Sequence, residues 1–223
     1  MEKKIFEEIK EHLLKDEKPS IYLNSIKNKL VGTPLEILAQ LETVEQEKKY
    51  HPEGNVWNHV MLVTDKAAEL REYSNDPESL MMAALLHDTG KKIATRKNKS
   101  GRLISYDHDK IGAKIVNEIL NCYDINNKKN EKIINLVKYH MHHLYIIKNL
   151  PFASTTEMIN SVNMRNMILL FISDRLGRGQ NTKEKILQEL FDVKEIVNIL
   201  QRKNKIDLQE EEKILDKLIK EEE

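Results

Sequence analysis

Apolar residues recur at spacings of three and four along almost the whole chain, and runs that alternate with a period of two are hard to find. Seven glycines and five prolines are few for 223 residues, so the helical pattern is rarely interrupted. We therefore expect an all-α fold. Helices are predicted, with ends defined to within about two to four residues, at about 2–15, 20–30, 34–49, 55–74, 77–89, 108–122, 129–146, 156–177, 182–202 and 207–221.

The helix predicted at 77–89 has the clearest boundaries. Asp76 can cap its first turn, Pro77 suits the first helical position, and Gly90 lies just beyond its last residues. Between them the segment LMMAALL, residues 80–86, is apolar on every face. A helix without a polar face has to lie at the centre of the molecule.

Several ionisable residues share the apolar faces of separate helices or lie at a buried helix end. They are His59, His87, Asp88, His108, His140 and Asp174. A single inward histidine is an ordinary hydrogen-bonded core residue. A whole set of such groups would each need a neutral partner, whereas one bound cation satisfies them together. Metal binding is the economical interpretation.

Three neighbouring residues receive other assignments. His142 shares the side of its helix that carries Asn135, so we expect it to face solvent. His143 lies near the edge of the apolar stripe, and a surface position is favoured over a role in the site. Trp57 is expected to be a core residue rather than a platform for a nucleobase.

The donor types narrow the choice of metal. Histidine nitrogen with carboxylate oxygen, and no thiolate, suits manganese, iron, cobalt, nickel or zinc rather than calcium, and leaves magnesium open. His87 and Asp88 point about a hundred degrees apart on a helix. They share an ion only if it lies between these directions near the helix end, where Gly90 leaves room for backbone and substrate.

Charge and composition restrict the classes of molecule that the chain is expected to bind. Lysine plus arginine and aspartate plus glutamate each number 36, so no global field attracts a long nucleic acid or an anionic membrane. A small phosphorylated substrate fits better. No apolar run approaches the ~18 residues that span a bilayer, and the charged start is unlike a signal sequence. Cys122 is the only cysteine, which excludes an internal disulfide and favours a cytoplasmic location.

The order His59, then LHDTGK at 86–91, then Asp174 resembles the metal motif of the HD-domain phosphohydrolase superfamily. Further segments resemble the HD domain of bacterial CCA-adding tRNA nucleotidyltransferases, and they are HPEGNVWNH at 51–59, YDHDKIGA at 106–113, LVKYHM at 136–141 and SDRLGR at 173–178. The resemblance covers roughly residues 48–178. It implies an HD-domain helical bundle. From the length of the chain we expect a single domain over 1–223, with helical extensions at 1–47 and 179–223.

The resemblance also implies a reaction. It is the hydrolysis of a phosphomonoester or a 2′,3′-cyclic phosphodiester of a nucleotide-like substrate by metal-activated water. Carried over residue by residue, the metal ligands are His59, His87, Asp88 and Asp174. Asp88 could also orient or deprotonate the water. Lys91 could hold a phosphate oxygen or, with Lys92, complement the negative end of the central helix.

A second group of residues, His108 and His140, supports two interpretations. His108 and His140 could be ligands of a second metal or, as we favour, phosphate-binding residues and donors of the leaving-group proton beside a single ion. Arg175 and Arg178 are candidate substrate contacts. An arginine after a buried aspartate more often stabilises the carboxylate and the helix end.

The limits of the resemblance leave alternatives open. No glycine-serine phosphate loop followed by paired carboxylates is found, so nucleotide addition to tRNA is not expected. A deoxynucleotide or signalling-nucleotide hydrolase and a non-catalytic, metal-containing regulatory module are the alternatives. The basic stretch 96–102 is expected to be a surface loop, with a lid or phosphate-guiding loop as the other reading. The last helix could pack on the domain or mediate self-association, and the oligomeric state is open.

Overall fold

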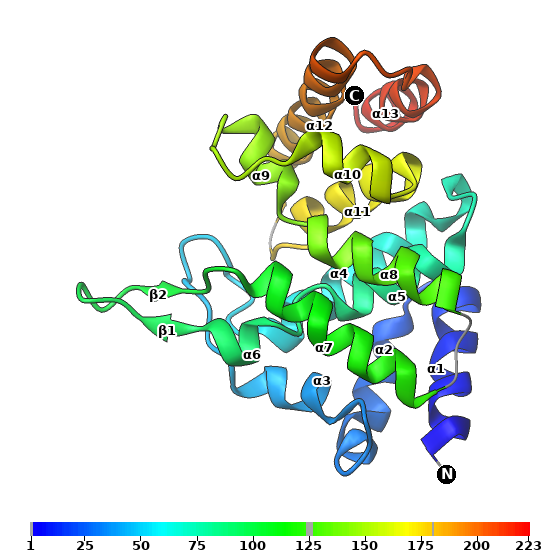
Figure 1. Cartoon of the computed structure of the whole chain (residues 1–223), viewed down its shortest axis with the longest axis vertical. Coiled ribbons are helices and arrows are strands. Elements are labelled where there is room, and N and C mark those ends of the chain that lie inside the picture. The colour runs from blue at the N-terminus through cyan, green and yellow to red at the C-terminus, as the bar shows by residue number, and fades with distance from the viewer. Residues whose placement is uncertain (1, 124–126, 180) are drawn as a thin grey trace.

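The computed structural model describes residues 2–123, 127–179 and 181–223 and confirms the all-α class (Figure 1). The first half contains α1 (Glu2–Lys15), α2 (Pro19–Ile26), η1 (Lys27–Leu30), α3 (Glu36–Gln40), η2 (Leu41–Thr43), α4 (Val56–Leu70), η3 (Arg71–Tyr73), α5 (Pro77–Leu86) and α6 (Lys91–Ala94), where η marks a 3₁₀ helix. A hairpin of β1 (Arg96–Lys97) and β2 (Leu103–Ile104) follows. The remaining elements are α7 (His108–Cys122), α8 (Asn127–Tyr139), α9 (His142–Ile147), α10 (Thr155–Ser161), α11 (Met164–Leu176), α12 (Lys183–Asn204) and α13 (Gln209–Glu222).

Helix α5 is the central element, as its apolar sequence requires. Its start is as predicted, because Asp76 accepts a hydrogen bond from the backbone N–H of Ser79 at 3.3 Å and Pro77 occupies the first turn. Every residue from Ser79 to Leu86 is buried. The helix packs against α1, α4, α8 and α11, so a polar face on it would lie in the core.

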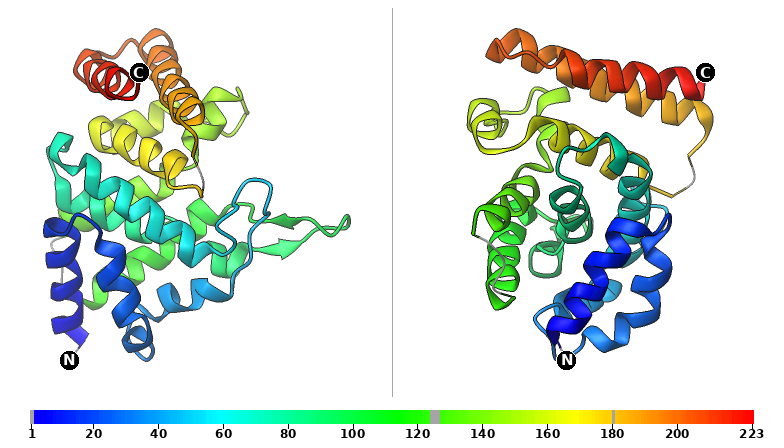
Figure 2. Two further views of the ribbon diagram at one scale, coloured as in Figure 1. Left: turned by 180° about the vertical axis from the view of Figure 1, so that it is seen from behind. Right: turned by 90° about the vertical axis from the view of Figure 1, so that its right-hand side faces the viewer.

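The last two helices lie together on one side of the bundle, far from the N-terminal helices (Figure 1; Figure 2). Thr182 caps α12, which packs against α11 and α9. Helix α13 folds back along α12, and the Lys183 ammonium donates to the backbone oxygen of Glu223 at 2.6 Å. The apolar side of α13 is covered by this packing, with Leu215 and Ile219 buried.

Two long predicted helices are wrong because each is two shorter elements. The segment predicted as one helix over 156–177 breaks between α10 and α11, where Asn163 accepts a hydrogen bond from Asn166 N at 3.0 Å and caps α11. The segment predicted over 129–146 breaks between Tyr139 and His142, although neither glycine nor proline lies there. Each break changes the direction in which the following side chains point.

The helix predicted over 34–49 is also wrong in its second half. After η2 the chain is extended, and Glu45 pairs with Asn55 in an isolated antiparallel bridge. The loop closed by this bridge leads into α4, whose start Asn55 caps by accepting from Asn58 N at 2.9 Å. The expected core position of Trp57 is confirmed, because the side chain is buried and its Nε1 donates to Asn24 at 2.8 Å.

The basic stretch 96–102 lies in the small hairpin, which projects from the body beside α6 (Figure 1). Arg96 pairs with Ile104 and Lys97 with Leu103 across the two strands. The predicted loop is therefore the turn of this hairpin together with β1. Within the described parts of the chain, no helix combines the length and apolarity needed to cross a membrane.

Candidate active site

The turn after α5 carries His87 and Asp88. Helix α5 ends at Leu86, and α6 begins only at Lys91. Gly90 has a φ of −64°, so it does not adopt the left-handed conformation of a glycine that terminates a helix. Its importance is close packing, because a Cβ atom there would lie 2.0 Å from the carbonyl oxygen of His108. The turn and the start of α7 are thereby held in backbone contact.

The four residues that the sequence suggested as metal ligands meet in the interior. Nε2 of His87 and Nε2 of His59 lie 3.3 and 3.6 Å from Oδ2 of Asp88. Nε2 of His59 also lies 3.1 Å from Oδ1 of Asp174. All four side chains are buried, and they come from α4, the turn after α5, and α11.

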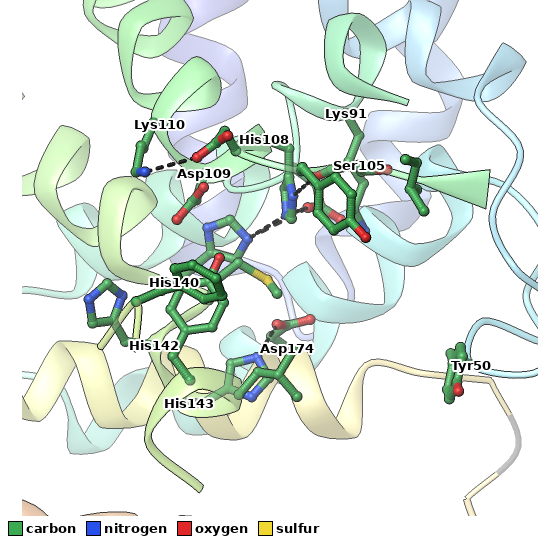
Figure 3. A pocket seen from close by; sticks show the side chains of 18 of the residues that line it. Tyr50, Lys91, Ser105, His108, Asp109, Lys110, His140, His142, His143 and Asp174 are labelled. Carbon is green, nitrogen blue, oxygen red and sulfur yellow. Dashed lines mark hydrogen bonds and ion pairs between the residues drawn. The ribbon is translucent and has the colours of Figure 1, made fainter. Parts of the chain in front are cut away.

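His108 and His140 lie at the other oxygen of Asp88. Their Nε2 atoms are 3.3 and 3.7 Å from Oδ1. The two rings are turned toward each other, with 3.2 Å between the Nε2 atoms (Figure 3). Asp88 thus has two imidazoles near each of its oxygen atoms. The predicted second group, His108 and His140, lies beside Oδ1.

Backbone carbonyls orient the imidazole rings. The Nδ1 atoms of His87, His108 and His140 lie 2.8, 2.7 and 2.7 Å from carbonyl oxygens, and that of His59 lies 3.1 Å from one. Because a carbonyl oxygen only accepts, each Nδ1 carries a proton and donates. In the neutral ring Nε2 then has a free lone pair, which is the arrangement of a histidine that binds a metal.

The free lone pairs meet other acceptors in the interior. With both rings neutral, the Nε2 atoms of His108 and His140 face each other at 3.2 Å without a proton between them. Among the described residues, Nε2 of His87 and both carboxylate oxygens of Asp88 have no hydrogen-bond partner. Oδ2 of Asp88 does form an ion pair with the Lys91 ammonium. Such a cluster needs protons or a cation to be stable.

A divalent cation fits the cluster. Among the described residues, three groups of three have ligand atoms within 4.8 Å of one another, and two of these groups contain Asp88. The two are His59, His87 and Asp88, and Asp88, His108 and His140, while the third is His51, Glu53 and His59. Asp174 extends the first group through its 3.1 Å contact with His59. The donors are imidazole nitrogen and carboxylate oxygen, which bind divalent metals.

Both central carboxylates are held in the ionised form. Burial by itself would raise the pKa of Asp88, but the Lys91 ammonium at 2.7 Å and the surrounding imidazoles hold it well below its usual range. Burial would likewise raise the pKa of Asp174. The charge of Arg178 and hydrogen bonds from His143 and His59 outweigh this effect and hold the pKa well below its usual range. The two side chains are therefore available as anionic ligands.

The predicted surface positions of His142 and His143 are wrong, because the two side chains are only 5% and 1% exposed. The prediction assumed one continuous helix, and the break after Tyr139 turns both rings inward. Nε2 of His143 donates to Oδ2 of Asp174 at 2.9 Å. Burial lowers the pKa of His143 to about 4, so the ring that supports Asp174 is neutral.

Lys91 and Arg178 are cations beside the central carboxylates. The Lys91 ammonium donates to Oε1 of Gln46 at 2.8 Å and pairs with Asp88. Nη2 of Arg178 lies 3.7 Å from Oδ1 of Asp174, and the side chain is partly exposed. Both residues line the pocket over the cluster, where an anionic group would meet their charges.

Arg175, the other arginine suggested as a substrate contact, points away from this pocket. Its guanidinium pairs with Glu189 at 2.6 Å and with Asp192, both on α12. Its Nη1 also donates to Nδ1 of His143 at 3.4 Å. Among the described residues, Arg178 lines the pocket and Arg175 does not. These contacts join α11 to α12.

Glu53 and His51 lie behind His59 and were not singled out in the sequence. Oε1 of Glu53 accepts from Nδ1 of His59 at 3.0 Å and from Nδ1 of His51 at 2.9 Å. Burial opposes ionisation of Glu53, but these hydrogen bonds lower its pKa below the ordinary value. A carboxylate at Nδ1 orients a metal-binding imidazole and makes it more basic. Helix periodicity could not place residues in a loop, so only their position in HPEGNVWNH hinted at a role.

The cluster opens into a cavity of about 1030 Å³. Figure 3 shows His140, His143 and Asp174 at its floor, with His142 and Asp109 to one side. The base of the hairpin and helix α9 form further walls. A cavity of this size accommodates a small molecule with a charged group over the carboxylates and a larger body beside them.

The comparison with protein families agrees with the geometry. A model of the HD domain family matches residues 56–220, which include every member of the His/Asp cluster that surrounds Asp88. The chain belongs to the HD domain family. HD domain proteins are generally metal-dependent hydrolases, and the buried cluster fits the binding of a divalent metal in this chain.

Known relatives of this HD domain include the Multifunctional CCA proteins. Those of Actinobacillus pleuropneumoniae serotype 5b (strain L20) and serotype 7 (strain AP76) are each 29% identical over 99 residues, which is 44% of this chain and 23% of the relative. That of Pasteurella multocida (strain Pm70) is 24% identical over 180 residues, 75% of this chain and 41% of the relative. The match spans less than half of each relative. It confirms the resemblance to CCA-adding enzymes seen in the sequence motifs.

Proposed function

We propose that this protein hydrolyses a phosphomonoester or a 2′,3′-cyclic phosphodiester of a nucleotide-like substrate with the help of a divalent metal. The proposed ligands are His59, His87, Asp88 and Asp174. The observation that carries the proposal is the direction of the imidazole rings. Each ring donates from Nδ1 to a backbone carbonyl, so that Nε2 lone pairs converge on buried, ionised carboxylates. A purely structural histidine would pair Nε2 with a donor or with water.

The donor set supports manganese, iron, cobalt, nickel or zinc, with magnesium as a further candidate. When bound, the cation lowers the pKa of a coordinated water toward ~7 and offsets charge that develops on the phosphate oxygens. Glu53 contributes indirectly, because its hydrogen bond to Nδ1 of His59 holds Nε2 toward the site.

The chain's own residues then orient and neutralise the substrate. The ionised Asp88 accepts a hydrogen bond from the attacking water and aims it at the phosphorus atom. Lys91 binds a phosphate oxygen as a point charge from one side of the cavity, and Arg178 from the other. The charges of Lys91 and Arg178 are offset by Asp88 and Asp174, so the charge of a bound divalent cation would be left to balance the phosphate.

His108 and His140 support two roles that metal stoichiometry separates. As ligands they would hold a second cation with Oδ1 of Asp88. Beside a single cation they would bind the phosphate and protonate the leaving oxygen. Two equivalents of metal, of which one is lost in His140→Ala, would indicate the first role. One equivalent, retained in the same variant, would indicate the second.

The test combines metal analysis of the purified protein with hydrolysis assays. The substrates are 2′,3′-cyclic nucleotides, nucleoside monophosphates, deoxynucleoside triphosphates and signalling nucleotides, each with the metals named above. We expect turnover that is lost in Asp88→Asn while helicity by circular dichroism is unchanged. Asp65→Asn is the matched control, because that carboxylate lies on the same bundle but binds the backbone and hydroxyl of Ser20.

The outcomes separate the competing functions. Hydrolysis of cyclic nucleotides or monophosphates supports the proposal. Activity restricted to deoxynucleoside triphosphates or to signalling nucleotides would assign the chain to another branch of the same superfamily. No turnover of any phosphoester with any of these metals would refute the proposal and favour a metal-containing regulatory module.

A further inference from the structure

Two buried polar side chains in the cavity have no task in the hydrolysis described above. Oδ1 of Asp109 has no hydrogen-bond partner among the described residues, and neither ring nitrogen of His142 has one. Asp109 is only 2% exposed, yet both residues line the cavity, beside His140 (Figure 3). A carboxylate so deeply buried is stable only if water or a ligand supplies donors.

An aromatic wall runs from this place to the mouth of the cavity. We define it as Tyr139, His142, Tyr145 and Phe152, whose successive ring centroids lie 4.9, 5.4 and 5.7 Å apart. All four line the cavity, and the wall begins at the buried Tyr139 and ends at Phe152, which is 64% exposed. A flat ring that enters the cavity can therefore stack against aromatic faces.

Asp109 and the aromatic wall border the same part of the cavity. Burial and then the negative charges of Asp109 and Asp107 raise the pKa of Tyr145 to about 12. Asp107 pairs with Lys110 at 2.8 Å at the surface, whereas Oδ1 of Asp109 is left free inside. The cavity thus holds a free carboxylate oxygen next to a surface suited to stacking.

We propose that this part of the cavity is a nucleobase subsite that selects bases carrying an amino group, an inference that rests on the proposed hydrolysis of nucleotides. The base stacks on the aromatic wall, and Asp109 accepts a hydrogen bond from its amino group. An ionised carboxylate has no donor, so it favours the amino group of cytosine or guanine and repels the carbonyl oxygen that uracil presents at the same position as the cytosine amino group.

Matched substrate pairs test this choice. Cytidine and uridine 2′,3′-cyclic phosphates differ at position 4, where an amino group is replaced by a carbonyl oxygen, and at N3, which carries a hydrogen only in uridine. Guanosine and inosine 2′,3′-cyclic phosphates differ only in the 2-amino group, so this pair isolates the effect of the amino group. We expect kcat/KM to favour the amino-bearing member of at least one pair by about tenfold or more, as for other hydrogen bonds to a charged group. In Asp109→Asn, whose amide both donates and accepts, this ratio should fall toward one.

Two further variants make the result specific. Asp107→Asn removes a carboxylate two residues away whose charge also reaches Tyr145, and it should leave the ratio as in the wild type. Phe152→Ala changes an exposed side chain, so folding is not at risk, and it should raise KM for every nucleotide with little change in kcat. A ratio near one in the wild type for both pairs would overturn the subsite and leave the hydrolase intact.

If the wild type hydrolyses none of these substrates and the proposed function fails, nucleoside binding still tests the nucleobase subsite. Cytidine, uridine, guanosine and inosine would be titrated into the full chain and followed by calorimetry or NMR. Tighter binding of the amino-bearing nucleosides, lost in Asp109→Asn and kept in Asp107→Asn, would support the subsite. Equal binding or no binding of all four would overturn it.

Discussion

Gly90 links the stability of the fold to the geometry of the site, which makes Gly90→Ala an informative substitution. Its φ of −64° and ψ of −20° are ordinary helical values, so alanine can adopt them without strain. In open space such a change would stabilise a protein by about 0.4–1 kcal/mol through the unfolded state. Any destabilisation must therefore come from steric contact in the folded protein.

The contact is severe because the atoms that the added Cβ would meet belong to the backbone of α7. The added Cβ would lie 2.0 Å from the carbonyl oxygen of His108 and 2.6 Å from the nitrogen of Gly112, whereas real Cβ atoms stay at least 3.0 Å away. No side-chain rotation relieves this, so α7 must move by about 1 Å. Overpacking of this kind lowers the free energy of unfolding by about 1–3 kcal/mol, occasionally more.

The same movement displaces His108 from Asp88. A shift of about 1 Å at a catalytic site reduces turnover by roughly 10²-fold. Urea denaturation followed by circular dichroism gives the free energy of unfolding, and the phosphoesterase assay gives the rate. We expect both to fall in Gly90→Ala.

Two glycine variants serve as controls. A Cβ at Gly101, which lies in the hairpin turn with a φ of 78°, meets nothing within 4 Å, so Gly101→Ala adds backbone strain without disturbing α7. A Cβ at Gly112 would lie 3.3 Å from the nitrogen of Gly90, so Gly112→Ala should have a smaller effect than Gly90→Ala. Wild-type stability and turnover in Gly90→Ala would refute the close packing of the turn against α7.

Three other predictions concern the metal, its support and a helix start. A chelator should lower the thermal midpoint and added metal restore it, since a ligand at 100 times its Kd stabilises by ~2.7 kcal/mol; an unchanged midpoint would contradict metal binding by the native fold. Glu53→Gln should weaken metal binding in calorimetry by about 10–100-fold, because Nδ1 of His59 loses a charged acceptor; equal affinity would remove Glu53 from the site. Asn163→Ala, which removes the cap of α11, should lower the free energy of unfolding by ~1 kcal/mol. Ser154→Ala should change it by less than ~0.5 kcal/mol, because Ser154 forms no side-chain cap.

Local signals in the sequence were enough for the class, the central helix and the burial of the main polar residues. Asp76 and Pro77 mark the start of α5, and its continuous apolar run requires a central position. His59 and Asp174 were correctly expected to be buried because each shares a face with apolar neighbours on an uninterrupted helix. These properties depend on residues within a few positions of one another, which a linear pattern records.

Other features depended on how separate elements pack. His142 and His143 turn inward because the chain breaks after Tyr139 without a glycine or proline to mark the break. Glu53 reaches His59 from a loop, where side chains have no periodic direction. Helical periodicity records the direction of a side chain about its own axis, but the distance between atoms on different helices depends on how their backbones pack. For this reason the helical pattern was enough to place His59 and Asp174 in the interior, whereas the atoms that they contact, and the inward direction of His142 and His143, depended on the packing of separate elements.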